Sequence, residues 1–135
     1  MPKPVIRRAS EIEYEPQAAA EGLKKGVLLG EEHGAPNFRM RRFTLAPGES
    51  VPKHTNEVEH EQYVLEGEYT VGIRKEVGSS EGNVEPAEDV EYTVSAGDSM
   101  LIPAGTVHWY RNEGDEEIAF ICVVPNGVDE IQVLE

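Results

Sequence analysis

Residues 48–67 read GESVPKHTNEVEHEQYVLEG, and this stretch decides how the rest of the chain is interpreted. It starts at a Pro-Gly turn and ends at a glycine, so turn signals bound it on both sides. Residues 62–65 are rich in apolar and β-forming side chains and predict a strand. Two of the four histidines of the chain, His54 and His60, lie within this unit.

A second stretch has the same organisation. Residues 97–112 read GDSMLIPAGTVHWYRN, in which a Pro-Ala-Gly turn separates two β-rich runs, and the second run contains His108. Imidazole is the commonest metal ligand that proteins offer near neutral pH. Three of the four histidines therefore fall in two strand-turn-strand units, which predicts a metal site gathered from two hairpins.

The rest of the chain shows the same short-strand pattern. Turn signals recur every 8–12 residues, and no segment predicts a convincing amphipathic helix. This pattern favours an all-β fold, an antiparallel sandwich or barrel. Strands are predicted at residues 27–29, 38–45, 51–54, 60–65, 69–75, 91–94, 99–102, 107–111, 117–124 and 131–134.

Length predicts one domain over residues 1–135. Residues 1–22 carry three prolines and are interpreted as an N-terminal arm, which an adjoining subunit could contact. Residues 77–90 read VGSSEGNVEPAEDV. This polar and acidic run predicts a surface excursion from a hairpin.

Composition narrows the classes of partner. The formal net charge is −14, from 12 basic and 26 acidic residues. A surface of this sign repels nucleic acid and anionic membranes, so neither is an expected partner. No run approaches the roughly 18 apolar residues of a membrane span, and the charged N-terminus does not resemble a secretory signal. The single cysteine excludes an intrachain disulfide, and we expect a cytoplasmic protein.

The two stretches resemble the two signature motifs of the cupin superfamily. The second stretch has the family residue at every position of its motif, namely Gly97, Pro103, Gly105, His108 and Asn112. Together the motifs and the segment between them cover about half of the chain. The flanking predicted strands fit the same pattern more loosely.

The first stretch departs from the family motif at one position. Gly48, His54, His60 and Gly67 have the family spacing, but Asn56 stands where the family has a second histidine. The resemblance implies an antiparallel jelly-roll β-barrel with a metal near one mouth. The ligands it implies are His54, Asn56, His60 and His108.

Two questions about this ligand set stay open from the sequence. His54 and Asn56 are two residues apart, so on a strand both side chains point to the same face. The Asn56 amide oxygen is a weaker donor than imidazole, and it would either bind the metal or hydrogen-bond a water on it. The family spacing selects His60 as the third ligand, with Glu61 as the alternative. The metal would be a divalent transition metal, Fe, Mn, Ni, Zn or Cu.

Other side chains are candidates for the pocket beside the metal. Gln62 has the same strand parity as His60 and is expected to face the barrel interior. Met40 and Arg41 are neighbours, so only one of them can face inward. An inward Arg41 would hold a substrate carboxylate, although a solvated arginine at the rim is the favoured interpretation. Cys122 lies in the most apolar predicted strand and is interpreted as a buried, inert residue.

The resemblance leaves the activity open, because one fold hosts many functions. The leading hypothesis is a small metal-dependent enzyme, similar to a dioxygenase, that acts on a small organic substrate at open coordination positions. An isomerase or decarboxylase is the second, and it would need Glu59 or Glu61 as an acid-base residue. A ligand-binding or sensor module without chemistry is the third. Exposed edge strands and the N-terminal arm predict a homodimer.

Overall fold

The structure is a computed structural model that describes residues 3–75, 88–127 and 131–134. It is built almost entirely of strands, with two short 3-10 helices, η1 (Ala9–Glu11) and η2 (Glu31–His33). The strands are β1 (Tyr14–Pro16), β2 (Leu23–Leu29), β3 (Phe38–Leu45), β4 (Ser50–Asn56), β5 (His60–Glu66), β6 (Glu68–Lys75), β7 (Glu88–Ser95), β8 (Ser99–Ile102), β9 (His108–Arg111), β10 (Ile118–Pro125) and β11 (Ile131–Val133).

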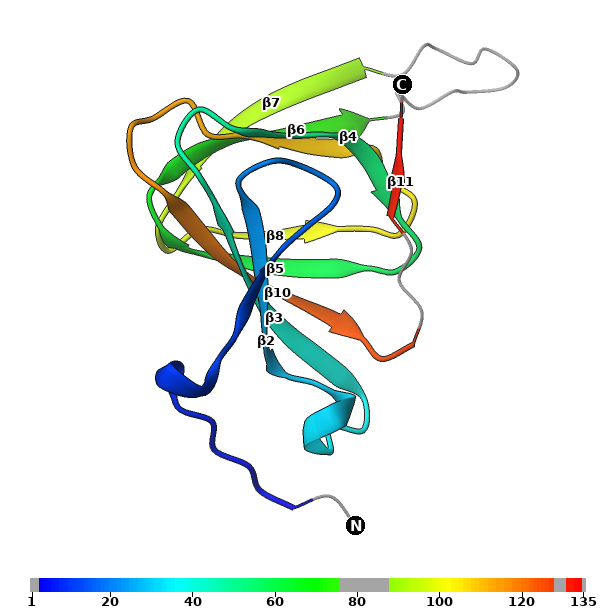
Figure 1. The fold of residues 1–135 in the computed structure, drawn as a ribbon. Coiled ribbons are helices and arrows are strands. Elements are labelled where there is room, and N and C mark those ends of the chain that lie inside the picture. Colours follow the sequence, from blue (N-terminus) through cyan, green and yellow to red (C-terminus); the bar gives the residue numbers. More distant parts are fainter. Residues whose placement is uncertain (1–2, 76–87, 128–130, 135) are drawn as a thin grey trace, which may run out of the picture.

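These strands form two sheets in which every strand pair is antiparallel. One sheet has the order β1-β2-β3-β10-β5-β8, and the other has the order β11-β4-β9-β6-β7. The sheets face one another, and the chain crosses between them repeatedly (Figure 1). The predicted antiparallel jelly-roll fold is confirmed.

Alternation of side chains along the strands builds the core. In β5, residues 60, 62 and 64 are buried while residues 61 and 63 are exposed. The strand β10 is apolar almost throughout and lies between β3 and β5 in the middle of its sheet. The apolar core between the sheets includes Leu45, Val64, Val71, Tyr110, Ile118 and Phe120.

Some predicted strand limits match the structure, and others are shifted by a few residues. Residues 38–45 and 99–102 form strands with the predicted bounds. The strand β2 begins at Leu23, four residues before the predicted start, because it pairs with β3 from Leu23 onward. The strand β7 takes up the last residues of the predicted 77–90 excursion, and the other residues of that excursion lie outside the described part of the chain.

The N-terminal arm contacts the barrel through a short strand and through Arg7, whose Nη1 atom donates to the carbonyl oxygens of Val27 and Leu28. Tyr14 pairs with Gly26, which makes β1 the edge of the six-stranded sheet. Before this strand the arm extends away from the barrel (Figure 1). No helix within the described ranges has the length and apolar character needed to cross a membrane.

Candidate metal site and ligand pocket

A cavity of about 270 Å³ lies between the two sheets at one end of the barrel. Three of the four predicted metal ligands, His54, Asn56 and His60, line it. Gln62 and Arg41 line it as well. The segment that links β1 to β2 contributes residues 17–19 to the wall, so part of the predicted N-terminal arm belongs to the pocket.

An irregularity in β4 aims His54 into this cavity. Val51 pairs with Tyr110, but His54 pairs with His108, so three steps along β4 match two steps along β9. Such a β-bulge shifts the alternation by one residue and lets both Val51 and His54 point inward. Pro52 lies inside the bulge, where its missing N–H costs no ladder hydrogen bond. A proline inside a predicted strand was the sequence signal for this bulge.

His54 and His108 face each other across neighbouring strands, with ring centroids 4.1 Å apart. The Nδ1 atom of His54 lies 2.7 Å from the carbonyl oxygen of Pro52, and that of His108 lies 2.9 Å from the carbonyl oxygen of Thr106. A carbonyl only accepts, so each Nδ1 carries the hydrogen, and in a neutral imidazole this leaves the lone pair on Nε2. Histidines that bind metals are held by outer hydrogen bonds of this kind.

His60 approaches from the opposite sheet. It is buried on β5, and its ring centroid lies 6.4 Å from that of His108. Its Nδ1 atom contacts the Sγ atom of Cys122 at 3.0 Å. The fold therefore brings the three predicted histidines together from β4, β5 and β9.

Asn56 faces the same cavity as His54, as their spacing predicts. Its Oδ1 atom is buried and has no hydrogen-bond partner among the described residues. Buried polar atoms in native proteins are normally bonded, so an oxygen of this kind points to a missing partner. A metal ion, a water on that ion or a ligand donor would each satisfy it. Glu61, the alternative ligand, is exposed on the outer face of β5.

The donor chemistry of this site fits a divalent transition metal. Three imidazoles and a neutral amide oxygen suit Fe, Ni, Cu or Zn. As the side chains stand, no group of three or more His, Cys, Asp or Glu residues in the described part of the chain could hold a metal ion. Metal binding therefore requires at least one of these side chains to shift, and His60 is the most distant of the three.

One cross-strand row forms the floor of the pocket. Cys122 on β10 pairs with Arg41 on β3 and with Gln62 on β5. Directly paired residues point to the same face of a sheet, so all three side chains point inward. Arg41 is only 7% exposed, and the interpretation of it as a solvated rim arginine is therefore wrong. Met40 points the other way and does not line the cavity.

The contacts of Arg41 are unusual for a buried arginine. Its Nη2 atom lies 3.4 Å from the Sγ atom of Cys122, and its guanidinium lies 5.2 Å from the centre of the Phe43 ring. Its Nε atom is buried without a hydrogen-bond partner in the described part of the chain. No carboxylate of the described residues lies within ion-pair distance of it. The prediction that Cys122 is buried holds, but Cys122 also contacts two residues of the pocket.

Gln62 and Tyr110 connect the two sheets inside the barrel. The Gln62 Nε2 atom donates a hydrogen bond of 2.7 Å to the Tyr110 hydroxyl. Burial raises the pKa of Tyr110, and the hydrogen bond from Gln62 opposes this rise only in part. The phenol is therefore neutral at physiological pH. Because its oxygen accepts the bond from Gln62, its own O–H can be donated to a ligand.

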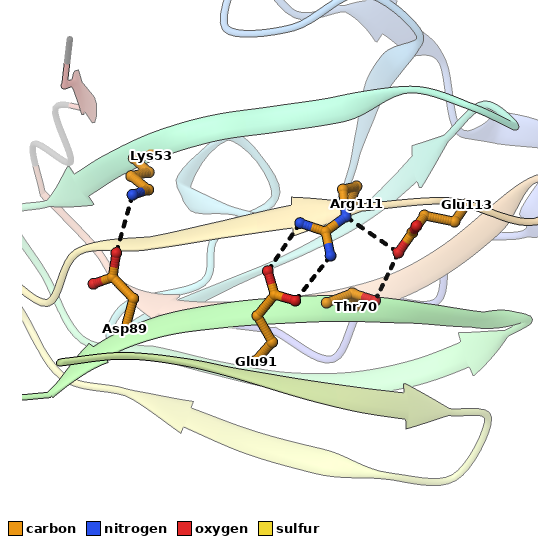
Figure 2. A network of polar contacts seen from close by, with 6 residues as sticks. All are labelled: Lys53, Thr70, Asp89, Glu91, Arg111 and Glu113. Carbon is orange, nitrogen blue, oxygen red and sulfur yellow. Dashed lines mark hydrogen bonds and ion pairs between the residues drawn. The ribbon is translucent and has the colours of Figure 1, made fainter.

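A polar network on the outer face of the five-stranded sheet supports the strands that carry His54 and His108 (Figure 2). Arg111 on β9 makes two hydrogen bonds to the Glu91 carboxylate on β7, each 2.9 Å long. Lys53 on β4 contacts Asp89 at 3.0 Å and also lies 4.8 Å from the centre of the Trp109 ring. Trp109 thus faces away from the pocket. Thr70 and Glu113 complete the network.

Comparison with known proteins gives one family. The family model described as "Cupin domain" matches residues 41–124, more than half of the chain. The chain is 24% identical over 133 residues to auxin-binding protein 1 of Arabidopsis thaliana, a match that covers 98% of this chain and 64% of that protein. The chain therefore spans less than two thirds of the length of that relative.

Two solved structures show the same fold. The polyketide cyclase RemF from Streptomyces resistomycificus superposes with a TM-score of 0.77 at 22% identity, over 97% of this chain and 87% of that one. A cupin-2 domain protein from Rhodospirillum rubrum superposes with a TM-score of 0.76 at 18% identity, over 100% of this chain and 83% of that one. At these identities the likeness concerns the fold alone.

Proposed function

Because this chain belongs to the cupin domain family, whose members commonly bind transition metals, we propose that it is a small metal-dependent enzyme. His54, His60 and His108 bind a divalent transition metal, and Asn56 binds it or a water on it. The adjoining cavity holds a small organic substrate. When bound, the metal supplies Lewis-acid and redox chemistry beside that substrate.

The observation that carries this proposal is the pair formed by His54 and His108. Their ring centroids lie 4.1 Å apart, the His54 ring lines the cavity, and both rings have Nδ1 on a backbone carbonyl. This arrangement supports two Nε2 lone pairs directed toward a shared ion. Other side chains that line the cavity act on the substrate directly. Apolar side chains around the cavity exclude water, and Arg41 and Tyr110 orient the substrate.

Oxygenase-type chemistry is favoured over an isomerase or decarboxylase that relies on a carboxylate. No Asp or Glu is found among the described residues that line the cavity. Glu59 and Glu61, the two acidic candidates, are exposed. A mechanism that uses one of them as an acid-base residue therefore lacks a carboxylate in reach of the substrate.

Ligand binding without turnover is the second candidate. The relative from Arabidopsis thaliana is named for binding auxin. The unpartnered polar atoms of Asn56 and Arg41 in the cavity would be satisfied by any fitting ligand, whether or not it reacts. Turnover is the property that separates the two candidates.

Metal content by mass spectrometry tests the proposal. We expect near-stoichiometric binding of one transition metal by the purified chain, and its loss in His108→Ala. His33→Ala is the matched control, because His33 lies outside the cavity. Its Nδ1 atom accepts a hydrogen bond of 3.0 Å from the backbone N–H of Gly30. The proposal is contradicted if the chain binds no metal even when metal is supplied in excess. It is also contradicted if the His108→Ala variant still binds the metal. Oxygen uptake with candidate substrates then separates turnover from binding.

The proposal includes a cytoplasmic homodimer that forms through edge strands. The edge strand β1 follows an arm in which Val5 and Ile6 are exposed, and exposed edges pair readily with other chains. Light scattering after size exclusion is expected to give a dimeric mass. Ile6→Asp is expected to weaken the dimer, whereas a monomeric mass for the unaltered chain at working concentration contradicts it. Fractionation of producing cells tests the location.

A further inference from the structure

We propose that the cavity binds a small organic anion, in which one carboxylate is attached to a compact ring. The carboxylate contacts Arg41 and the Tyr110 hydroxyl, and a hydroxyl or amide N–H on the ring donates to Gln62. This inference rests on the proposed function, because it takes the cavity beside the three histidines as the substrate site.

Charge distribution is the first argument. The chain as a whole carries a formal charge of −14, with more than two acidic residues for every basic one. The cavity differs from this balance, since Arg41 lines it and none of its described lining residues is acidic. A buried guanidinium in a pocket without acidic lining residues favours the binding of an anion there, even though the chain as a whole is acidic.

The second argument is the state of Arg41. A buried guanidinium without a paired carboxylate is costly, so buried arginines are normally paired. Within the described residues, its only hydrogen-bond partner is the weakly accepting sulfur of Cys122. Arginine presents its donors in a planar fork that matches a carboxylate. An anionic ligand would supply the acceptor that the chain lacks here.

The third argument comes from the acceptors on the same cavity. The Oε1 atom of Gln62 and the Oδ1 atom of Asn56 are both buried without hydrogen-bond partners among the described residues. Gln62 already uses its Nε2 on Tyr110, which orients Oε1 as an acceptor. A ligand that only accepts hydrogen bonds would leave this oxygen unsatisfied. The ligand is therefore expected to carry a donor as well as a carboxylate.

Size and apolar lining define the body of the ligand. A cavity of about 150 Å³ is enough for benzene. The cavity here is about 270 Å³, which leaves space for a ring with one or two small substituents. Phe43 and Phe120, which stack at 5.3 Å, line one wall, and Leu23 and Val51 line others. A compact ring would pack against these side chains.

Calorimetric titration with matched probes tests the inference on the unaltered protein. The probes are 4-hydroxybenzoate and 4-hydroxybenzamide, which have nearly the same shape but differ in charge. A charge-assisted hydrogen bond to Arg41 predicts about tenfold tighter binding of the carboxylate. Benzoate, which lacks the donor, is expected to bind more weakly than 4-hydroxybenzoate. Equal binding of the acid and the amide, or no binding of either, overturns the inference.

Two substitutions on β3 assign the effect to one side chain. Arg41→Gln is expected to abolish the preference for the carboxylate, and Arg41→Lys to keep part of it. Arg42→Gln is the matched control, because Arg42 is the next residue but points outward to Glu66 at 3.3 Å. A preference that survives in folded Arg41→Gln, as judged by circular dichroism, contradicts the assignment.

Metal content measured on the same samples separates this inference from the proposed function. Metal bound in stoichiometric amount without any preference for carboxylates contradicts the inference alone. Carboxylate binding by a chain that takes up no metal contradicts the proposed function alone, and the anion site then stands by itself.

Discussion

The Nδ1 atom of His60 lies 3.0 Å from the Sγ atom of Cys122, on the neighbouring strand of the same sheet. The Nδ1 atoms of His54 and His108 contact backbone carbonyls, whereas that of His60 contacts a side chain. A side chain can be replaced without altering the backbone. In the proposed metal site Cys122 would position His60, and this role can be tested directly.

We expect Cys122→Ala to weaken metal binding by about 10-fold to 100-fold, the range observed when outer hydrogen bonds to metal ligands are removed. Cys122→Ser keeps a donor and acceptor and is expected to retain more of the affinity. Competition with a chelating dye measures both. Val124→Ala, a buried substitution on the same strand, controls for simple cavity formation. Unchanged affinity in Cys122→Ala would show that the contact is incidental.

Tyr110→Phe is expected to lower the free energy of unfolding by roughly 1–3 kcal/mol, because it leaves the buried Gln62 Nε2 donor without its acceptor. Urea denaturation measures the change. The double variant with Gln62→Leu removes both polar groups, and it is expected to recover part of the loss. Strictly additive losses in the double variant would contradict a direct interaction between the two side chains.

Gly72→Ala is expected to destabilise the chain by about 1–3 kcal/mol, because the added methyl group would collide with the indole of Trp109. Trp109 is the only tryptophan, so its fluorescence reports the displacement during urea unfolding. Gly114→Ala is the control, since a methyl group there meets nothing closer than 3.5 Å. Equal stability of the two variants would refute the prediction.

Hydrogen bonds from Arg74 and then Lys53 lower the pKa of Asp89 to about 2. A carboxyl whose pKa is lower in the folded state stabilises the fold above its unfolded pKa of about 4, and this contribution is lost as the pH falls toward 2. Asp89→Asn should therefore reduce stability near pH 7 and flatten its dependence between pH 4 and 2. Thermal melts of the variant and the unaltered chain across this pH range measure the change in stability, with Asp115→Asn as an exposed control.

The sequence predicted the fold well because strands that alternate in polarity, and turns that contain glycine and proline, are local signals. Residues 38–45 have a strand pattern and are flanked by turn residues at both ends, and they form β3 with the predicted limits. The inward direction of Gln62 followed from its parity with His60. Such inferences need only the period of a strand.

The direction of Arg41 could not be predicted in the same way. Met40 and Arg41 alternate, and local pattern gives no reason to bury the charged residue. Only pairing with Cys122 and the resulting row with Gln62 place the guanidinium inside the barrel. The contact between Cys122 and His60 is likewise tertiary, since 62 residues separate them. Long-range pairing of this kind leaves no local signal.

The bulge in β4 decides which side chain faces His108. With regular pairing from Val51 and Tyr110 onward, Lys53 would stand opposite His108, and His54 would lie on the outer surface. An ammonium group would then occupy the place of an imidazole and repel any cation. One extra residue in the strand thus places the imidazole of the proposed metal site, and not an ammonium group, opposite His108. Lys53 instead contacts Asp89 and the Trp109 ring on the outer face. A chain of identical composition without that one-residue offset would keep the barrel and lose the site.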